Sequence, residues 1–292
     1  MKNIIVVTGG AGFVGSNLIE LLLKKTKLKI ISIDNYSSGL KKNHIKNNRV
    51  RYFKSHTKNI SRVLFNKKKN IHTIFHFGEF ARIYQSFLKL SECIESNSIG
   101  THAVINFCMD NKIKLIYSAT SASLGNMGKD KDLSPYAFTK AKNLEMLENL
   151  KKWYQFKFEI IYFYNVYGPK QICKGNMATV IGIFEEFYRK NKALPVVKPG
   201  SQSRRFTHIQ DTIEVCYYAW KQNKHRHYSI SNKKSFTILE AARLFKTKIK
   251  YLPARRGERY ASALTNMNLS NKVYKKFGKI NLKEYINEIL NN

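Results

Sequence analysis

Thr8-Gly9-Gly10-Ala11-Gly12-Phe13-Val14-Gly15 is the stretch that decides the fold. It follows the apolar run Ile4–Val7 and opens Phe13–Lys25, whose apolar residues recur at helical spacing. This order predicts a strand, a tight turn and a helix. The G-x-x-G-x-x-G spacing lets backbone N–H groups approach a pyrophosphate at the start of that helix, where partial positive charge favours an anion. The segment therefore predicts a dinucleotide site.

An acidic residue ends the second predicted strand and refines this prediction. Asp34 stands 19 residues after Gly15. A carboxylate there can accept hydrogen bonds from the hydroxyls of an adenosine ribose and repels a 2′-phosphate. The position therefore favours NAD over NADP as the cofactor. The alternative, that Asp34 only forms a turn with Asn35, stays open.

Apolar runs and helical patterns alternate through the first 165 residues. The predicted strands are Ile4–Val7, Leu28–Ile33, Ile71–Phe77, Ile113–Tyr117 and Glu159–Tyr164, and the helical stretches between them lie near Ser91–Met109 and Pro135–Trp153. Asp211-Thr212 predicts the start of a further helix, before Ile213–Lys221. Such alternation implies a parallel sheet covered on both faces. We expect the α/β class, with a Rossmann-type doubly wound parallel sheet and a smaller mixed α/β C-terminal substrate domain. Residues 1–167 form the expected NAD-binding domain, with a return segment at about 205–232, and residues 168–292 the smaller substrate-binding portion.

Tyr136-Ala137-Phe138-Thr139-Lys140 places a phenol and an ammonium four residues apart on one face of a predicted helix. Ser134 as N-cap and Pro135 at the first helical position predict where that helix starts. A phenol with a pKa of about 10 is a poor base, and lowering that value by about 3 units needs roughly 4 kcal/mol. The lysine, a nicotinamide cation and a hydroxyl donor together can supply this interaction energy. The alternative is that Tyr136 and Lys140 only belong to a solvated face of this helix.

Taken together, the glycine loop, Asp34, Tyr136 and Lys140 resemble the extended short-chain dehydrogenase/reductase family. The likeness is greatest to its NAD-dependent epimerase/dehydratase branch, which includes the UDP-glucose (UDP-galactose) 4-epimerases. Further matching segments are Asp34–Gly39, Asn97–Thr101, Tyr164–Pro169 and Arg204–Ile209. The resemblance covers residues 1 to about 262 and is more specific for the family than for the substrate.

The resemblance implies a set of site residues. The catalytic residues would be Thr120, Tyr136 and Lys140. The cofactor NAD would be bound by Gly9, Gly12, Phe13, Gly15, Asp34, Asn35, Asn97, Tyr136 and Lys140. The substrate would be bound by Arg82, Thr120, Asn165, Arg204, Arg255 and Ser262. Arginine suits a diphosphate because its planar fork pairs two oxygens at once.

The positions after Thr120 favour one chemistry within the family. Dehydratases carry an Asp-Glu pair there, whereas this chain has Ser121-Ala122. The resemblance thus implies an NAD-dependent nucleotide-sugar 4-epimerase that acts on a UDP-hexose or UDP-N-acetylhexosamine by transient C4 oxidation and re-reduction. A small residue at Ser262 is associated with tolerance of an N-acetyl group. A reductase, a decarboxylase, a uronate epimerase or a non-catalytic basic RNA-binding relative remain alternatives.

The sequence also departs from the family pattern. Ser55-His56-Thr57 replaces the usual Gly-Asp-Ile or Gly-Asp-Leu, so adenine would be held by another contact. The usual H-L-A-A segment is His76-Phe77-Gly78-Glu79, which introduces a carboxylate near the cofactor. From the sequence, Glu79 is either structural or a substrate contact.

Composition limits the remaining function classes. The net charge of +33 comes from basic residues scattered along the chain, which fits a compositional bias better than a nucleic-acid site. The four cysteines form no C-x-x-C pair and have no zinc spacing, so no metal is predicted. No run approaches 18 apolar residues, and the N-terminus does not read as a signal peptide. We expect a cytoplasmic protein without membrane contact, in a homodimer as in many relatives.

Overall fold

The computed structural model describes residues 2–229, 231–257 and 277–291, apart from the side chains of residues 124–128. A seven-stranded sheet with strand order β11-β6-β5-β4-β1-β2-β3 forms its centre, and every pairing in it is parallel. The strands are β1 (Ile4–Thr8), β2 (Lys29–Asp34), β3 (Val50–Lys54), β4 (Ile71–His76), β5 (Lys114–Thr120), β6 (Phe158–Phe163) and β11 (His227–Ser229). This order confirms the predicted Rossmann-type doubly wound sheet.

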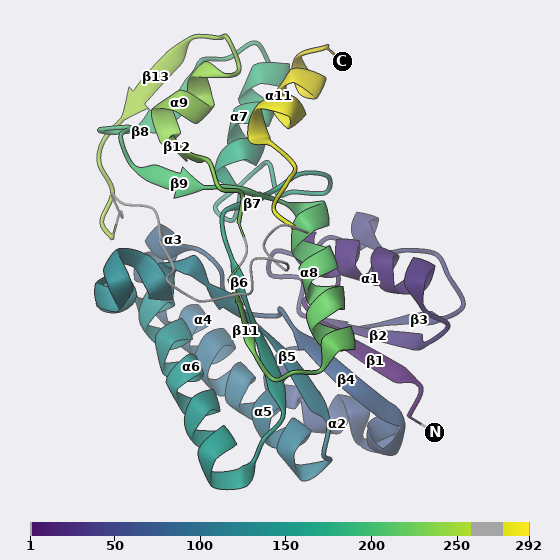
Figure 1. Ribbon diagram of the computed structural model, residues 1–292. Coiled ribbons are helices and arrows are strands. Elements are labelled where there is room, and N and C mark those ends of the chain that lie inside the picture. Colours follow the sequence, from purple (N-terminus) through teal and green to yellow (C-terminus); the bar gives the residue numbers. More distant parts are fainter. Residues whose placement is uncertain (1, 230, 258–276, 292) are drawn as a thin grey trace.

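Helices cover both faces of the sheet (Figure 1). One face carries α1 (Phe13–Lys25) and α8 (Ile209–Gln222). The other carries α2 (Ile60–Leu64), α4 (Leu90–Ile94), α5 (Thr101–Asp110) and α6 (Pro135–Tyr154). Short 3₁₀ segments occur at Lys41–Asn43, Thr57–Asn59, Phe65–Asn70 and Ser121–Asp132. The two-sided cover explains why the strands read as continuous apolar runs.

Two predicted helix boundaries are corrected. The stretch near Ser91–Met109 is not one regular α-helix, because a π-helical turn, Glu95–Gly100, separates α4 from α5. Such turns widen a helix locally and occur often at functional sites. The helix expected to start at Asp211 begins at Ile209 instead, because the His208 side chain accepts a hydrogen bond from the Gln210 amide and acts as N-cap.

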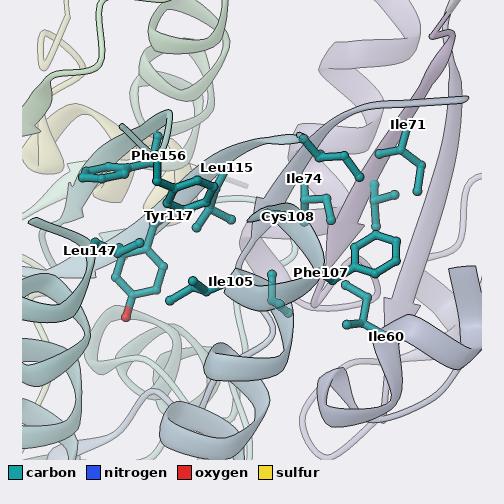
Figure 2. Close-up of a cluster of buried hydrophobic side chains, with 14 of the residues drawn as sticks. Ile60, Ile71, Ile74, Ile105, Phe107, Cys108, Leu115, Tyr117, Leu147 and Phe156 are labelled. Carbon is teal, nitrogen blue, oxygen red and sulfur yellow. The ribbon is translucent and has the colours of Figure 1, made fainter. Parts of the chain in front are cut away.

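The core beneath α5 and α6 is dense and apolar. Figure 2 shows Tyr117 and Leu115 of β5 and Leu147 of α6, whose exposed fractions are all 0%. Burying one such side chain is worth about 1.5–3 kcal/mol. The core therefore fixes α6 against the end of β5, the two elements that carry the predicted catalytic residues.

The remaining elements form a smaller mixed α/β portion above the sheet (Figure 1). It contains α7 (Val180–Arg189), β8 (Leu194–Val197), β9 (Ser203–Arg205), β12 (Ser235–Thr237), α9 (Ile238–Arg243), β13 (Ile249–Leu252) and α11 (Leu282–Asn291). Strand β8 pairs with β13 in parallel, and β9 pairs with β12 antiparallel. This portion has its own apolar core, which includes Phe184, Phe245 and Ile286. The domain boundary after residue 167 stays a prediction.

Three further short elements lie between the large sheet and this portion. Strands β7 (Val166–Tyr167) and β10 (Thr207–His208) pair in parallel, and α3 (Ile83–Leu88) follows the loop after β4. They bring the carboxyl ends of β4, β5 and β6 close to the smaller portion. None of the described helices is long and apolar enough to cross a membrane.

Candidate active site

The glycine loop turns tightly between β1 and α1, as predicted. Gly9 has a φ of +70°, and a Cβ there would stand 2.9 Å from backbone atoms of Phe77 and Gly78. A Cβ on Gly15 would stand 2.2 Å from the carbonyl oxygen of Gly9. A side chain at either position would fill the turn, so glycine is required for steric reasons.

The start of α1 fits an anionic group. Its N-cap is Gly12, which has no side chain that could accept a hydrogen bond from the first amides of the helix. Those amides and the helix dipole suit a diphosphate. The Phe13 side chain is buried beneath the turn. The residues present therefore fit a dinucleotide, with Gly9, Gly12 and Gly15 forming the cradle.

Asp34 lies beside the glycine loop at the carboxyl end of β2. Its carboxylate accepts hydrogen bonds from the amides of Ala11 at 3.0 Å and Tyr36 at 2.8 Å. Burial raises the pKa of Asp34, and these backbone hydrogen bonds oppose that rise. The neighbouring Asn35 accepts from the Ser37 amide at 3.0 Å. Ribose binding by Asp34 and Asn35 stays a prediction.

The three predicted catalytic residues come from two adjacent elements. Thr120 is the last residue of β5 and is buried, and its hydroxyl accepts a hydrogen bond from the Ala122 amide at 3.1 Å. Tyr136 and Lys140 lie on the first turns of α6, which Ser134 caps by accepting from the Ala137 amide at 3.1 Å. The predicted cap and start of α6 are confirmed. Tyr136 is half-buried and Lys140 is 3% exposed.

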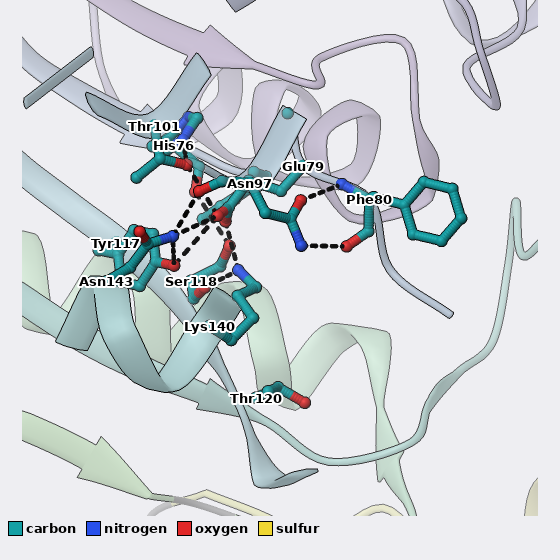
Figure 3. Close-up of polar contacts among 12 residues, drawn as sticks. His76, Glu79, Phe80, Asn97, Thr101, Tyr117, Ser118, Thr120, Lys140 and Asn143 are labelled. Atoms are coloured by element: carbon teal, nitrogen blue, oxygen red, sulfur yellow. Dashed lines mark hydrogen bonds and ion pairs between the residues drawn. The ribbon is translucent and has the colours of Figure 1, made fainter. Parts of the chain in front are cut away.

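Lys140 forms an ion pair with Glu79, the carboxylate that the family pattern lacks. The Lys140 ammonium contacts Glu79 Oε2 and donates to the Ser118 carbonyl (Figure 3). Glu79 Oε1 accepts from Thr101 Oγ1 at 2.9 Å and from Tyr117 OH at 3.0 Å. Burial lowers the pKa of Lys140, and the Glu79 charge opposes this change. Glu79 is thus part of the site and lies inside it, away from solvent.

A hydrogen-bond chain connects this pair with the glycine loop. Thr101 donates to Glu79, so it must accept from His76 Nε2, 2.9 Å away. His76 Nδ1 then accepts from Thr8 Oγ1 at 2.7 Å, and Thr8 Oγ1 accepts from the Gly78 amide at 3.0 Å. Burial lowers the pKa of His76 to about 4, so the ring is neutral. The Glu79 carboxylate, which can only accept, therefore sets the donor-to-acceptor direction of this series of hydrogen bonds.

Asn97 clamps the loop after β4 onto α6. Its side-chain oxygen accepts from the Phe80 amide at 2.6 Å, and its NH₂ donates to the Phe80 carbonyl at 3.1 Å. The same NH₂ donates to Thr139 Oγ1 at 3.2 Å. In the structure Asn97 positions the segment that carries Glu79. Cofactor binding by Asn97 stays a prediction.

Arg82 joins the two portions of the molecule. Its guanidinium donates to the carbonyls of Ala178, at 3.2 Å, and of Met177, ahead of α7. It also donates to the Ala81 carbonyl at 2.6 Å. Burial lowers the pKa of Arg82, and the nearby Tyr136 opposes this change. Arg82 therefore lies next to the predicted base, while a direct substrate contact stays a prediction.

The other predicted substrate residues lie on separate segments above the sheet. Asn165 follows β6 and donates to the Arg205 carbonyl at 2.9 Å. Arg204 lies in β9, is 7% exposed and donates to the Ser203 carbonyl at 2.8 Å. Arg255 follows β13 and lies 5.3 Å over the Tyr84 ring of α3. Ser262 lies outside the described residues, and a diphosphate clamp of Arg204 and Arg255 stays a prediction.

The residues that depart from the family pattern have defined places. His56 caps the 3₁₀ turn after β3 by accepting from the Lys58 amide at 3.1 Å, and its other ring nitrogen lies 3.3 Å from Ser96 Oγ. Ser121 and Ala122 are buried directly after Thr120. No group of three or more metal-binding side chains occurs in the part of the chain that the structure describes.

Three members of the Glu79 network were not singled out from the sequence. They are Thr101, Tyr117 and Asn143; Asn143 donates to Tyr117 OH at 3.1 Å. The sequence did hold one signal for Asn143, because it follows Lys140 by three residues on the same helix face. Thr101 stood out only as the last residue of the family-like segment Asn97–Thr101, and Tyr117 looked like an ordinary residue of its strand.

Comparisons with known proteins agree with this geometry. The model of the "NAD dependent epimerase/dehydratase family" matches residues 5–231. ADP-L-glycero-D-manno-heptose-6-epimerase of Brachyspira hyodysenteriae is 26% identical over 83% of this chain and 80% of its own length. The solved UDP-glucose 4-epimerase of Thermotoga maritima has a TM-score of 0.87 and 23% identity, covering 99% of this chain and 97% of its own.

A second solved structure shows the same fold. UDP-N-acetylglucosamine 4-epimerase of Methanobrevibacter ruminantium has a TM-score of 0.85 and 24% identity, covering 100% of this chain and 98% of its own. The family match spans the glycine loop, Thr120, Tyr136 and Lys140, and the family description agrees with the predicted cofactor, NAD. The solved structures that share this fold include UDP-sugar 4-epimerases, and the chain belongs to the NAD-dependent epimerase/dehydratase family.

Proposed function

We propose that this chain is a nucleotide-sugar 4-epimerase that acts on a UDP-hexose or a UDP-N-acetylhexosamine. One observation carries the proposal. Thr120 ends β5, Tyr136 and Lys140 lie at the start of α6, and Ser121-Ala122 stands directly after Thr120 in place of two carboxylates. The site thus has a base and a hydroxyl for oxidation at a sugar carbon, without the acid pair that elimination needs.

The chain's own residues have distinct roles in this proposal. Tyr136, as phenolate, removes the proton of the sugar 4-hydroxyl, and general-base help of this kind is worth about 10²–10⁴-fold in rate. Lys140 favours the phenolate through its charge. The Thr120 hydroxyl orients the reacting oxygen. NAD, when bound to the glycine cradle, supplies the reversible oxidation at C4. Asn165, Arg204 and Arg255 hold the diphosphate while the sugar turns.

A second epimerisation is a specific competitor. The curated relative at 26% identity is an ADP-heptose 6-epimerase, which also inverts one sugar carbon. We therefore test UDP-glucose, UDP-N-acetylglucosamine, UDP-glucuronate and ADP-heptose side by side, and follow the sugar protons by NMR with and without added NAD. A 4-epimer from either of the first two supports the proposal. Turnover of ADP-heptose alone, or of none of the four, contradicts it.

We further propose a homodimer that works in a reducing, cytoplasmic compartment. Large apolar side chains are exposed along the helices of one face of the sheet: Ile94 36%, Ile99 54%, Met146 37% and Trp153 67%. A contiguous exposed apolar surface often marks an interface. Light scattering should give twice the 34.0 kDa chain mass, and Trp153→Lys should shift it to the monomer. A wild-type monomer contradicts the dimer.

A further inference from the structure

The pair of Glu79 and Lys140 is almost sealed from solvent. The two side chains are 2% and 4% exposed. Removing one charge from water in such a place costs several kcal/mol, so an unpaired partner there is strongly destabilised in its charged form. The three other polar contacts of the carboxylate, with Thr101, Tyr117 and Asn143, are all made by uncharged donors. Lys140 is therefore the group that balances the Glu79 charge.

Several elements around Lys140 contribute titratable groups. Besides Glu79, they are His76 of β4, Cys93 of α4, Tyr117 of β5 and Tyr136 of α6. Burial lowers the pKa of His76 to about 4, raises that of Cys93 to about 11, and raises that of Tyr117 well above its usual range. These three are neutral near pH 7. Among the described neighbours, Glu79 supplies the stabilising negative charge.

We propose that Glu79 is the counter-ion that keeps the Lys140 ammonium charged and fixes its position, and is thus a positioning residue of the active site. It holds Lys140 through a direct ion pair and is itself held by Thr101 and Tyr117. The importance of a charged Lys140 rests on the proposed function, in which it favours the Tyr136 phenolate. The contact between Glu79 and Lys140 does not rest on it.

Removing the Glu79 charge should leave burial as the dominant influence on Lys140. Buried lysines without a counter-ion have pKa values as low as about 5–6. Glu79→Gln keeps the size and the accepting oxygen of the side chain but removes its charge. In this variant the titration midpoint of Lys140 should fall by at least ~2 units relative to the unsubstituted chain.

The test is an NMR titration of protein labelled with ¹³C at lysine Cε, with no cofactor or sugar added. The Lys140 ammonium lies 4.7 Å over the Tyr117 ring, whose ring current separates its signal. Loss of that signal in Lys140→Met identifies it. Thr101→Val is the matched control, because it removes a 2.9 Å hydrogen bond to the same carboxylate but leaves the charge. Its midpoint should stay near that of the unsubstituted chain. An unshifted midpoint in Glu79→Gln overturns the proposal.

If Glu79→Gln does not fold, its melting temperature is compared with that of a double variant. If an unpaired Lys140 charge causes the failure, Glu79→Gln combined with Lys140→Met should regain most of the lost melting temperature. If the double variant is as unstable as Glu79→Gln, the carboxylate is only structural and the proposal is wrong. Neither experiment uses a nucleotide sugar. A shifted midpoint in a protein without epimerase activity would refute the proposed function alone.

Discussion

Substitution of Gly15 by alanine tests the glycine cradle directly. The added Cβ would stand 2.2 Å from the Gly9 carbonyl oxygen and 2.8 Å from the Gly10 Cα, all of it backbone. The turn must therefore open by about 1 Å to reach an ordinary contact distance. Overpacking of this kind costs about 1–3 kcal/mol, whereas the better helix propensity of alanine returns at most about 1 kcal/mol. The overpacking energy therefore exceeds the gain in helix propensity.

The expected result is a specific loss of NAD affinity. Moving the first amides of α1 away from the diphosphate should raise the Kd for NAD at least ~10-fold, which corresponds to about 1.4 kcal/mol. Isothermal titration calorimetry measures this Kd, and circular dichroism checks the fold.

Gly182→Ala is the matched control for that experiment. Gly182 also lies in the first turn of a helix, α7, where a Cβ would stand 2.6 Å from the Ile172 carbonyl. The clash is similar but lies away from the cradle. This variant should lose stability and keep its Kd for NAD. A folded Gly15→Ala variant with unchanged NAD affinity would show that the glycine loop does not hold the diphosphate of NAD.

Three further predictions follow from the site. Tyr136→Phe removes the proposed base but keeps the aromatic ring, so it should lower kcat by about 10²–10⁴-fold. Steady-state kinetics measure this loss, and near-normal turnover would exclude Tyr136 as the base. His76 is buried and has a pKa of about 4, against 6.5 in the unfolded chain. The unfolded chain therefore binds an extra proton between these values, so the free energy of unfolding should fall by about 3 kcal/mol as the pH drops from 6.5 to 4. Urea unfolding across this pH range measures the loss, and a flat profile contradicts it. Arg82→Met leaves the carbonyls of Ala178 and Met177 without their donor and should destabilise by about 1–3 kcal/mol; an unchanged melting temperature would show that the guanidinium contacts add nothing.

The sheet was predictable because its signals are local. The glycine loop between an apolar run and a helical pattern predicts the first β-α unit, and continuous apolar strands indicate a sheet covered on both faces. The signal for the start of α6 is equally local, since Ser134 accepts a hydrogen bond from an amide three residues later and Pro135 occupies the first helical position. The start of α8 was missed because a histidine, His208, serves as its cap, and histidine is not among the usual N-cap residues.

The inner contacts of the site could not be read from the sequence. Glu79 was noticed as a departure from the family, but its role depends on Lys140, which lies 61 residues away. Likewise, the Arg82 contacts cross 95 and 96 residues to Met177 and Ala178. Pairings over such separations depend on how the sheet brings the chain together. The π-helical turn before α5 had no signal in the periodic pattern either.

In the proposed function, the configuration at C4 inverts through reversible oxidation of the sugar by a cofactor that the protein retains. The most direct test is conversion of UDP-glucose or UDP-N-acetylglucosamine in D₂O, followed by mass spectrometry of the product. We expect a 4-epimer without deuterium at C4, since the hydrogen removed from that carbon returns to it. A product carrying solvent deuterium at carbon, or no 4-epimer from either sugar, would contradict it.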